Sequence, residues 1–181
     1  ENVVKLARMI GYTPSSAKSA RTIVDIAVQT AFPYPKSVTI AAGLVLNFTG
    51  LDNNNFVFSV PTDISQSVDS LTGIASFNNT VLFEGLFLTD TFVKDTTQRQ
   101  RFILTNERVD TTSMIVEVTS GTITEKYLQA TDITKIDSTS KVFFLEESEY
   151  QIPEILFGDG VIGKSLENGD VVTVKYTTSA G

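Results

Sequence analysis

Apolar and polar residues alternate with a period of two along much of this chain, a pattern typical of half-buried β-strands. The alternation is clearest over residues 21–29 and 170–177. Further segments rich in Val, Ile, Thr and Phe predict strands at residues 38–40, 44–48, 56–60, 81–93, 100–105, 113–119, 141–145 and 154–157. Turn residues separate these short segments. The pattern therefore predicts a mainly β (α+β) fold built on an antiparallel or mixed sheet or sandwich.

One segment at the amino end has helical spacing instead. Its apolar residues fall on one face of a helix: Val3, Leu6, Ala7 and Ile10. Gly11 follows where a left-handed C-terminal cap would lie. Because a helix of about ten residues is marginal by itself in water, this face must pack against the domain or a partner. We therefore expect one short N-terminal helix whose apolar face is the first candidate interface.

The chain is long enough for one ordinary globular domain, with 181 residues of which 41% are hydrophobic. We expect residues 1–20 to form the helix and a linker, and residues 21–181 to form a β-rich domain. A boundary near residues 61–80 makes residues 62–140 a candidate insertion within that domain. Because the chain starts at Glu1, we expect it to be a fragment or a processed product.

Short polar and glycine-containing segments predict the turns. A turn at residues 41–43, which ends in Gly43, separates two apolar runs and predicts a hairpin of the strands on either side. Near the carboxyl end, the predicted turn residues are Gly158, Asp159 and Gly160, then Asn168 and Gly169. The first of these two turns would join the strand at residues 154–157 to Val161 and Ile162. The second would lead into the last strand.

The composition excludes a good deal of chemistry, because the chain has no Cys, no His and no Trp. Without His or Cys there is no Ser-His-Asp or Cys-His pair, no thiol redox chemistry and no zinc site of the usual nitrogen or sulfur type. The net charge is −7 and Lys and Arg do not cluster, which argues against a nucleic-acid partner. No apolar run approaches the roughly 20 residues that span a bilayer, so we expect no membrane insertion.

Residues 158–165 match the phosphate-binding loop pattern G-x-x-x-x-G-K-[ST] in full, ending in Lys164 and Ser165. In nucleotide-binding proteins a helix begins at that Lys-Ser pair, and its N-terminus helps to hold the phosphates. Here only Leu166 and Glu167 precede a predicted turn and a strand pattern, so the helix is missing. We therefore interpret the match as a turn and expect no cofactor.

Two polar clusters offer chemistry but have simpler interpretations. Residues 52–55 carry side-chain oxygens that suit calcium, yet they lack the ligand spacing of a calcium loop and predict a solvated turn. Four carboxylates lie close together in sequence: Glu146, Glu147, Glu149 and Glu154. Two of them would serve glycoside hydrolysis only in a cleft and at a defined separation, and clustered acids usually form a solvated surface. We predict no catalytic residue and no metal site.

The apolar run at residues 81–93 carries three aromatic side chains, Phe83, Phe87 and Phe92. Core packing is the preferred interpretation, because large apolar side chains are mostly buried. An exposed hydrophobic interface is the alternative, because contiguous apolar patches on a surface mark interaction sites.

Two separated segments carry motifs that occur together in one family. The first has LARMIGYTP at residues 6–14, ART at 20–22 and VTIAAG at 38–43. The second has FGDGVIGK at residues 157–164 and LENGD at 166–170. In this order and at this separation, they resemble the amino-proximal to middle part of T-even-type phage baseplate wedge subunits and baseplate J-like proteins. One departure is Ala41, where such proteins often carry proline.

The resemblance implies a structural subunit of a contractile phage tail baseplate, present in the virion and assembled in the host cytoplasm. It implies protein–protein contacts with a second copy and with other baseplate wedge proteins, no catalytic residues, an FGDG hairpin, and further chain on both sides. The acidic, Ser/Thr-rich β composition leaves one alternative of another class, a carbohydrate-binding or adhesin module of a phage or bacterial surface protein. An enzyme comes third.

Overall fold

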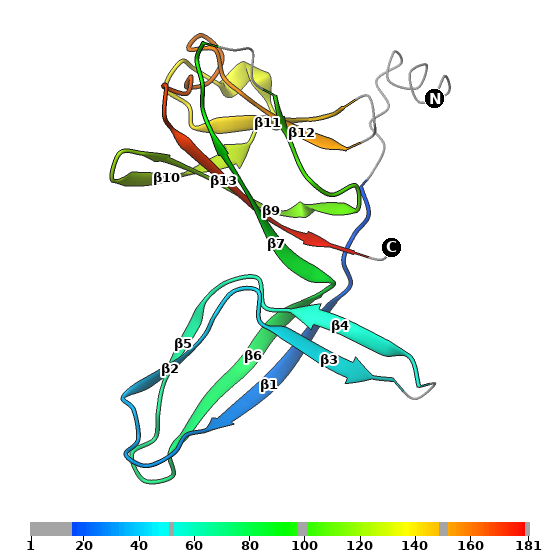
Figure 1. Cartoon of the computed structure of the whole chain (residues 1–181), viewed down its shortest axis with the longest axis vertical. Helices are drawn as coiled ribbons and strands as arrows, with labels where there is room; N and C mark the ends of the chain where they lie inside the picture. The colour runs from blue at the N-terminus through cyan, green and yellow to red at the C-terminus, as the bar shows by residue number, and fades with distance from the viewer. Residues whose placement is uncertain (1–15, 51–52, 98–100, 149–151, 180–181) are drawn as a thin grey trace.

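The computed structural model describes residues 16–50, 53–97, 101–148 and 152–179. Strands dominate these residues, and the one helix among them is the short 3₁₀ helix η1 (Ile133–Lys135). The chain folds into a smaller lobe with strands β1 to β6 and a larger lobe with strands β7 to β13 (Figure 1). The prediction of a mainly β fold with antiparallel or mixed sheets is therefore confirmed. The predicted N-terminal helix lies outside the described residues.

The smaller lobe packs a four-stranded sheet against a two-stranded one (Figure 1). The four-stranded sheet is antiparallel and has the order β1-β6-β4-β3. Its strands are β1 (Arg21–Gln29), β6 (Ile74–Glu84), β4 (Asn55–Ser59) and β3 (Val45–Thr49). The two-stranded sheet pairs β2 (Ser37–Ile40) with β5 (Ile64–Ser67).

Alternation along β1 fixes which face of the four-stranded sheet is buried. Val24, Ile26 and Val28 pack against the core, while the residues between them are exposed. The buried members of this core are Ile40, Val60, Ala75, Phe77 and Leu82. The strand predicted at residues 21–29 is thereby confirmed, and its alternate residues Arg21, Ile23, Asp25, Ala27 and Gln29 form the outer face of the sheet.

The larger lobe is one seven-stranded sheet in the order β7-β13-β9-β10-β11-β12-β8. Every neighbouring pair is antiparallel except β10 and β11, which are parallel. Its strands are β7 (Leu86–Val93), β8 (Phe102–Ile103), β9 (Val109–Ser120), β10 (Ile123–Gln129), β11 (Val142–Glu147), β12 (Pro153–Phe157) and β13 (Val171–Thr178).

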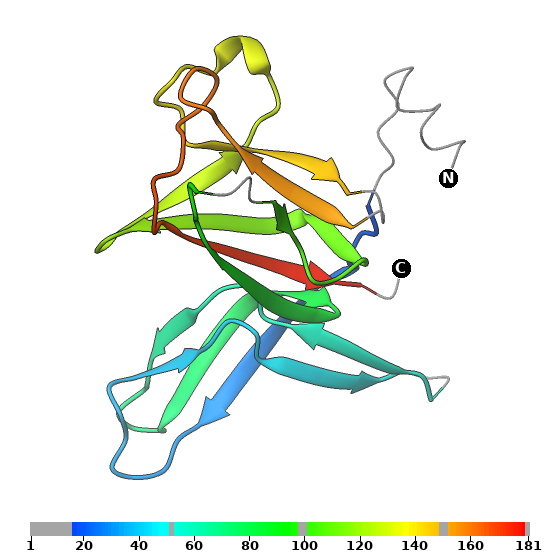
Figure 2. The same ribbon diagram turned by 45° about the horizontal axis from the view of Figure 1, so that its top comes forward.

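This sheet curls until its two edge strands approach one another (Figure 2). The rings of Phe92 in β7 and Phe102 in β8 meet edge to face, with centroids 5.6 Å apart. Val172, Val174 and Tyr176 of β13 are fully buried inside the curl, as their alternation predicts. Curling encloses one apolar core and brings the otherwise unpaired edges of the sheet together.

The predicted hairpin around Gly43 is wrong in its pairing. The turn itself is present, with Gly43 at φ +85° and the Leu44 N–H donating to Ala41 O over 3.2 Å. However, β2 before the turn pairs with β5, whereas β3 after it pairs with β4. The turn therefore carries the chain from one sheet of the smaller lobe to the other, because each flanking strand finds its partner later in the sequence.

The two lobes meet at Gly85, between β6 and β7. Residues 62–140 contribute strands to both lobes. The proposed division of the chain at residues 20, 62 and 140 stays a prediction.

Candidate interaction surfaces

The interface predicted from the amino end consists of Val3, Leu6, Ala7 and Ile10, with Gly11 as the cap. All five lie outside the described residues, so this interface stays a prediction. In the described part of the chain, large apolar side chains are exposed on both lobes, and on the smaller lobe they include residues on the outer face of the four-stranded sheet, in the loops at its far end and at the Phe48–Phe56 pair of β3 and β4.

The outer strip is our name for Ile23, Val45, Val81 and Phe83, which lie on the solvent face of the four-stranded sheet. Ile23 lies directly opposite Val81 in the register, and these side chains are 66% and 40% exposed. Val45 shares the next row of the same face with Phe83. The Arg21 guanidinium lies 4.4 Å from the centroid of the Phe83 ring, a cation–π contact. Ile23, Val81 and Phe83 thus form a group of neighbouring apolar side chains beside a cation, while Ser59 of β4 lies between Phe83 and Val45.

Two of the three aromatic residues of the run at 81–93, Phe83 and Phe92, lie in different surroundings. Phe92 packs against the core of the larger lobe, as predicted. Phe83 belongs to the outer strip, on the face opposite the core of the smaller lobe. Gly85 interrupts the run, so the residues before and after it belong to different sheets.

The distal tip is our name for residues 30–36 and 69–73, the two loops at the end of the smaller lobe farthest from the larger lobe (Figures 1 and 2). The two most exposed large apolar side chains of the described residues lie here. Leu71 is 89% exposed and Phe32 is 83% exposed. Hydrogen bonds join the two loops that carry these side chains.

A polar joint connects the two lobes around Asp110, at the start of β9. Its carboxylate is fully buried and accepts hydrogen bonds from the Ser19 N–H (3.0 Å), the Thr112 N–H (2.9 Å) and the Thr112 hydroxyl (2.6 Å). The neighbouring Ser16 and Thr111 hydroxyls are 2.7 Å apart. Residues 16–20 are therefore fastened to the larger lobe before the chain enters β1.

Burial alone would raise the pKa of Asp110. The hydrogen bonds from Thr112 and Ser19, together with the nearby charge of Arg21, outweigh burial and hold this pKa below its usual value. Asp110 is therefore an ionised carboxylate whose donors are all structural, and it is part of the joint rather than a reactive group.

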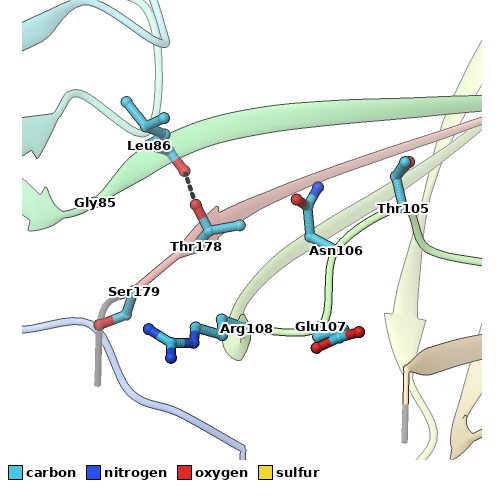
Figure 3. A pocket seen from close by; sticks show the side chains of 8 residues that line it. All are labelled: Gly85, Leu86, Thr105, Asn106, Glu107, Arg108, Thr178 and Ser179. Atoms are coloured by element: carbon cyan, nitrogen blue, oxygen red, sulfur yellow. Dashed lines mark hydrogen bonds between the residues drawn. The ribbon is translucent and has the colours of Figure 1, made fainter. Parts of the chain in front are cut away.

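A shallow hollow lies beside the joint, between the start of β7, the end of β13 and the loop at residues 105–108 (Figure 3). It has a volume of about 520 Å³ and is lined by Gly85, Leu86, Thr105, Asn106, Glu107, Arg108, Thr178 and Ser179. Asn106 donates to the Tyr176 hydroxyl (2.8 Å), which in turn donates to Asp90 (2.9 Å). Thr105 also binds Asp90 through its N–H and its hydroxyl.

These contacts anchor the loop at residues 105–108 to β7 and β13. Burial raises the pKa of Tyr176 to about 12, and the hydrogen bond to Asp90 acts in the same direction. At neutral pH the Tyr176 hydroxyl therefore keeps its proton and does not serve as a general base.

The phosphate-loop match at residues 158–165 is an irregular loop, and no helix follows it. Asp159 accepts hydrogen bonds from the N–H groups of Val161 and Ile162, both over 2.9 Å. The predicted turn at Gly158–Gly160 is therefore present, with Gly160 at φ +89°. The FGDG hairpin that the resemblance implies has no second strand here, because Val161 and Ile162 lie in the loop and are exposed.

Two further features show why this loop is structural. The chain crosses itself so closely that a Cβ on Gly158 would lie 2.2 Å from the Gly163 backbone. Lys164 forms an ion pair with Glu125 (3.3 Å), which also binds Lys141 (2.7 Å). The predicted turn at Asn168 and Gly169 is confirmed before β13, with Gly169 at φ +87°.

The carboxylates considered for glycoside hydrolysis do not form an open pair in the described residues. Glu154 is buried and binds Arg101 in a bidentate ion pair, in which Nε lies 2.7 Å from Oε1. Glu146 lies opposite Glu154 in the β11–β12 register. Glu149 lies outside the described residues. Nowhere in the described part of the chain do three or more acidic side chains converge in a way that would hold a metal ion.

Comparisons with known proteins return no match: no family model and no curated protein matches this chain. Among the residues that the structure describes, no helix is long and apolar enough to cross a membrane.

Sequence reasoning missed the joint and the distal tip. Asp110 and Ser19 are 91 positions apart, so no local pattern links them. Phe32 and Leu71 lie in segments for which the sequence predicts no strand; Pro33 and Pro35 follow the first residue and Gly73 follows the second. The sequence signal that could have revealed the distal tip is a large apolar side chain in an otherwise polar segment.

Proposed function

We propose that this chain is a structural, non-catalytic assembly module of a contractile phage tail baseplate, contributed to the wedge. Its partners are a second copy and other baseplate wedge proteins. The residue-level resemblance of the two segments at 6–43 and 157–176 supports the class of assembly. Its place is the virion, after assembly in the host cytoplasm.

One structural observation carries the proposal. At every candidate chemical centre among the described residues, the polar groups bind other parts of the chain: Asp110 binds Ser19, Glu154 binds Arg101, and Tyr176 binds Asp90. By contrast, apolar side chains such as Ile23 and Val81 are presented to solvent on a hydrogen-bonded sheet. A stiff body with exposed apolar contacts favours association over chemistry.

The experiment is a pull-down of the tagged full-length protein from the lysate of phage-infected host cells, with the co-eluting chains identified by mass spectrometry. Co-elution with other tail subunits is the expected result. Recovery alone, or together with host envelope glycans, would contradict the proposal and favour the adhesin alternative. A mock-infected lysate with the protein added is the control, because tail subunits are absent from it.

A further inference from the structure

We propose that the free edge of β3 pairs antiparallel with β3 of a second copy of this chain, about a twofold axis at Asn47. In naming a second copy the inference rests on the proposed function, and it deepens that function by assigning the contact to one sheet edge. It stands on the hydrogen-bond register of β3, on the apolar residues that β3 shares with β4 and on the lack of charge along β3.

The strand β3 is an edge strand, because the four-stranded sheet ends with it. Among the described residues it pairs with β4 alone. The β3–β4 hairpin projects from the smaller lobe, and β4 lies between β3 and the larger lobe (Figures 1 and 2). The free edge of β3 therefore faces away from the larger lobe, and its backbone groups are open to another strand.

The register with β4 determines which backbone groups of β3 point to the free edge. The Val60 N–H donates to Leu44 O (3.1 Å). Farther along the hairpin, the Gly50 N–H donates to Asn54 O (2.8 Å). Hydrogen-bonded pairs alternate along an antiparallel ladder, so the even-numbered residues of β3 bond to β4. The residues whose N–H and C=O groups turn to the free edge are consequently Val45, Asn47 and Thr49.

These three residues are in register for pairing with a second copy. When Asn47 lies opposite its own counterpart, Val45 lies opposite the partner's Thr49. Each opposed pair then exchanges two hydrogen bonds, and the free edge is paired over the whole length of β3. Main-chain bonds of this kind supply the affinity when a strand adds to a sheet edge.

The same register completes two apolar rows on one face of the hairpin. Leu46 lies opposite Phe58, and both pack against the core of the smaller lobe. Phe48 lies opposite Phe56 on the same face, and these side chains are 39% and 43% exposed. In the proposed pair, the partner's Leu46 lies opposite Phe48. Phe48 is then covered on both sides, and each row is apolar across four strands.

Charge does not oppose this contact. Between residues 37 and 62 the sequence has a single charged residue, Asp52. The opposite edge of the sheet differs, since β1 carries Arg21 and Asp25 and its ladder with β6 is irregular at Asp25. Charges and bulges are common protection of an edge strand against pairing. The strand β3 has neither, so of the two edges it is the one open to self-pairing.

The alternative occupant is a strand of a different protein. Such a strand would need apolar residues at alternate positions and no charge, and β3 itself supplies both at the required spacing. One strand pair is smaller than the roughly 1,200–2,000 Å² of a standard interface, so we expect weak association in dilute solution. Copies held together in a larger particle would pair more completely, because their effective concentration is raised.

The first test uses a cysteine at position 47, because the chain has no Cys of its own. In the proposed pair the two Asn47 Cα atoms lie about 5.5 Å apart. We expect a short bis-maleimide reagent to convert concentrated, purified full-length Asn47→Cys to a covalent dimer. Ile123→Cys is the matched control, since Ile123 is 63% exposed on the larger lobe. Its dimer yield should be about tenfold lower or less, because its cysteines are not held together.

An exchange of charge tests the twofold axis. Asn47→Lys and Asn47→Asp each place like charges opposite one another, so each variant should associate about tenfold more weakly in sedimentation equilibrium. An equimolar mixture of the two should recover association, because the opposed charges then differ in sign. Both variants should fold normally, since Asn47 is exposed and its backbone does not bond to β4. Circular dichroism checks their folding.

Several results would overturn the inference: equal dimer yields for Asn47→Cys and Ile123→Cys, charge variants that associate like the unchanged protein, or a mixture that does not recover association. A dimer that forms through another surface gives these results. Cross-linking of Asn47→Cys in infected-cell lysate to a different protein, in place of a second copy, would assign the edge to another partner and contradict the proposal.

These experiments on purified protein separate the inference from the proposed function. A dimer linked at position 47, in a chain that is absent from tails, would support the β3 pairing and contradict the baseplate assignment. Incorporation of the chain into tails without a dimer at position 47 would support the baseplate assignment and overturn the β3 pairing.

Discussion

Gly85 is the residue at which the chain passes from one lobe to the other, and no other residue fits there. Its φ is +100°, and a Cβ would lie 1.7 Å from the carbonyl oxygen of Thr178. We predict that Gly85→Ala lowers the free energy of unfolding by about 3 kcal/mol or more, since the backbone of β13 must move. Gly121→Ala is the control, because its φ is +60° but nothing lies within 4 Å.

Urea unfolding of both variants checks this prediction. Gly121→Ala should lower the free energy of unfolding by only about 1–2 kcal/mol, because alanine is strained in the left-handed conformation. Equal losses in the two variants would show that the close approach to β13 is not what requires glycine at position 85.

Asp110 gives the joint a defined dependence on pH. Its folded-state pKa is lowered, so its stabilisation is present above the unfolded pKa of about 4 and is lost as the pH falls through the folded-state pKa. We predict that Asp110→Asn destabilises the protein by about 1.5–3 kcal/mol at pH 7, and that this difference shrinks below about pH 4.

Urea unfolding at pH 7 and at pH 3.5 measures this difference. Asp25→Asn is the control, since the exposed Asp25 also accepts a backbone hydrogen bond, from Asn79 (2.8 Å). A deficit in Asp110→Asn that stays constant across this pH range would mean that the ionised carboxylate is not what stabilises the joint.

At the scale of elements, alternation predicts strands better than it predicts their partners. The strands β1 and β13 follow from strict alternation, because one face of each is buried. By contrast, β5 and β10 were missed, since β5 has a single apolar residue, Ile64, and β10 buries only Tyr127. Pairing depends on contacts between distant segments, which is why the turn at Gly43 was predicted as a hairpin.

The candidate sites show the same division between local and distant information. The absence of a helix after Ser165 could be predicted from the turn at Asn168 and Gly169, and no helix follows Ser165 in the structure. The outer strip could not be predicted, because it depends on Ile23 and Val81, 58 positions apart in the sequence, lying opposite one another in the register.

The outer strip makes an assembly prediction. We expect the pair Ile23→Ser and Val81→Ser to reduce co-elution with tail subunits about tenfold or more, because contiguous exposed apolar residues are then lost. The change in stability should stay small, within about 1 kcal/mol, since both side chains are substantially exposed. The control pair is Ile123→Ser and Leu128→Ser, each 63% exposed on the larger lobe. Unchanged co-elution of the first pair would remove the strip from the interface.

The amino-terminal segment makes a second prediction at this scale. If Val3, Leu6, Ala7 and Ile10 form an apolar contact face, deletion of residues 1–12 should impair assembly into tails. The joint at Ser19 and Asp110 is retained in this variant, so its unfolding free energy should match that of the full chain. Native assembly of the truncated protein, followed by electron microscopy of tails, would contradict the predicted interface.

The described residues form two lobes with separate cores, which meet at Gly85 and at the joint around Asp110. Within each lobe, hydrogen-bonded sheets enclose the apolar residues, so the lobes are expected to move as stiff units. Exposed apolar side chains lie at the distal tip and on the outer strip, both on the smaller lobe. This arrangement suits a part that holds neighbours at fixed positions in a larger particle.

The most direct test of the baseplate proposal is quantitative mass spectrometry of purified contractile-tailed particles from the phage that, on this proposal, encodes the chain. We predict peptides from both lobes, at a constant ratio to other baseplate subunits, and their loss from particles that lack tails. Absence of the chain from tailed particles, or its recovery only with the host envelope, would contradict the account.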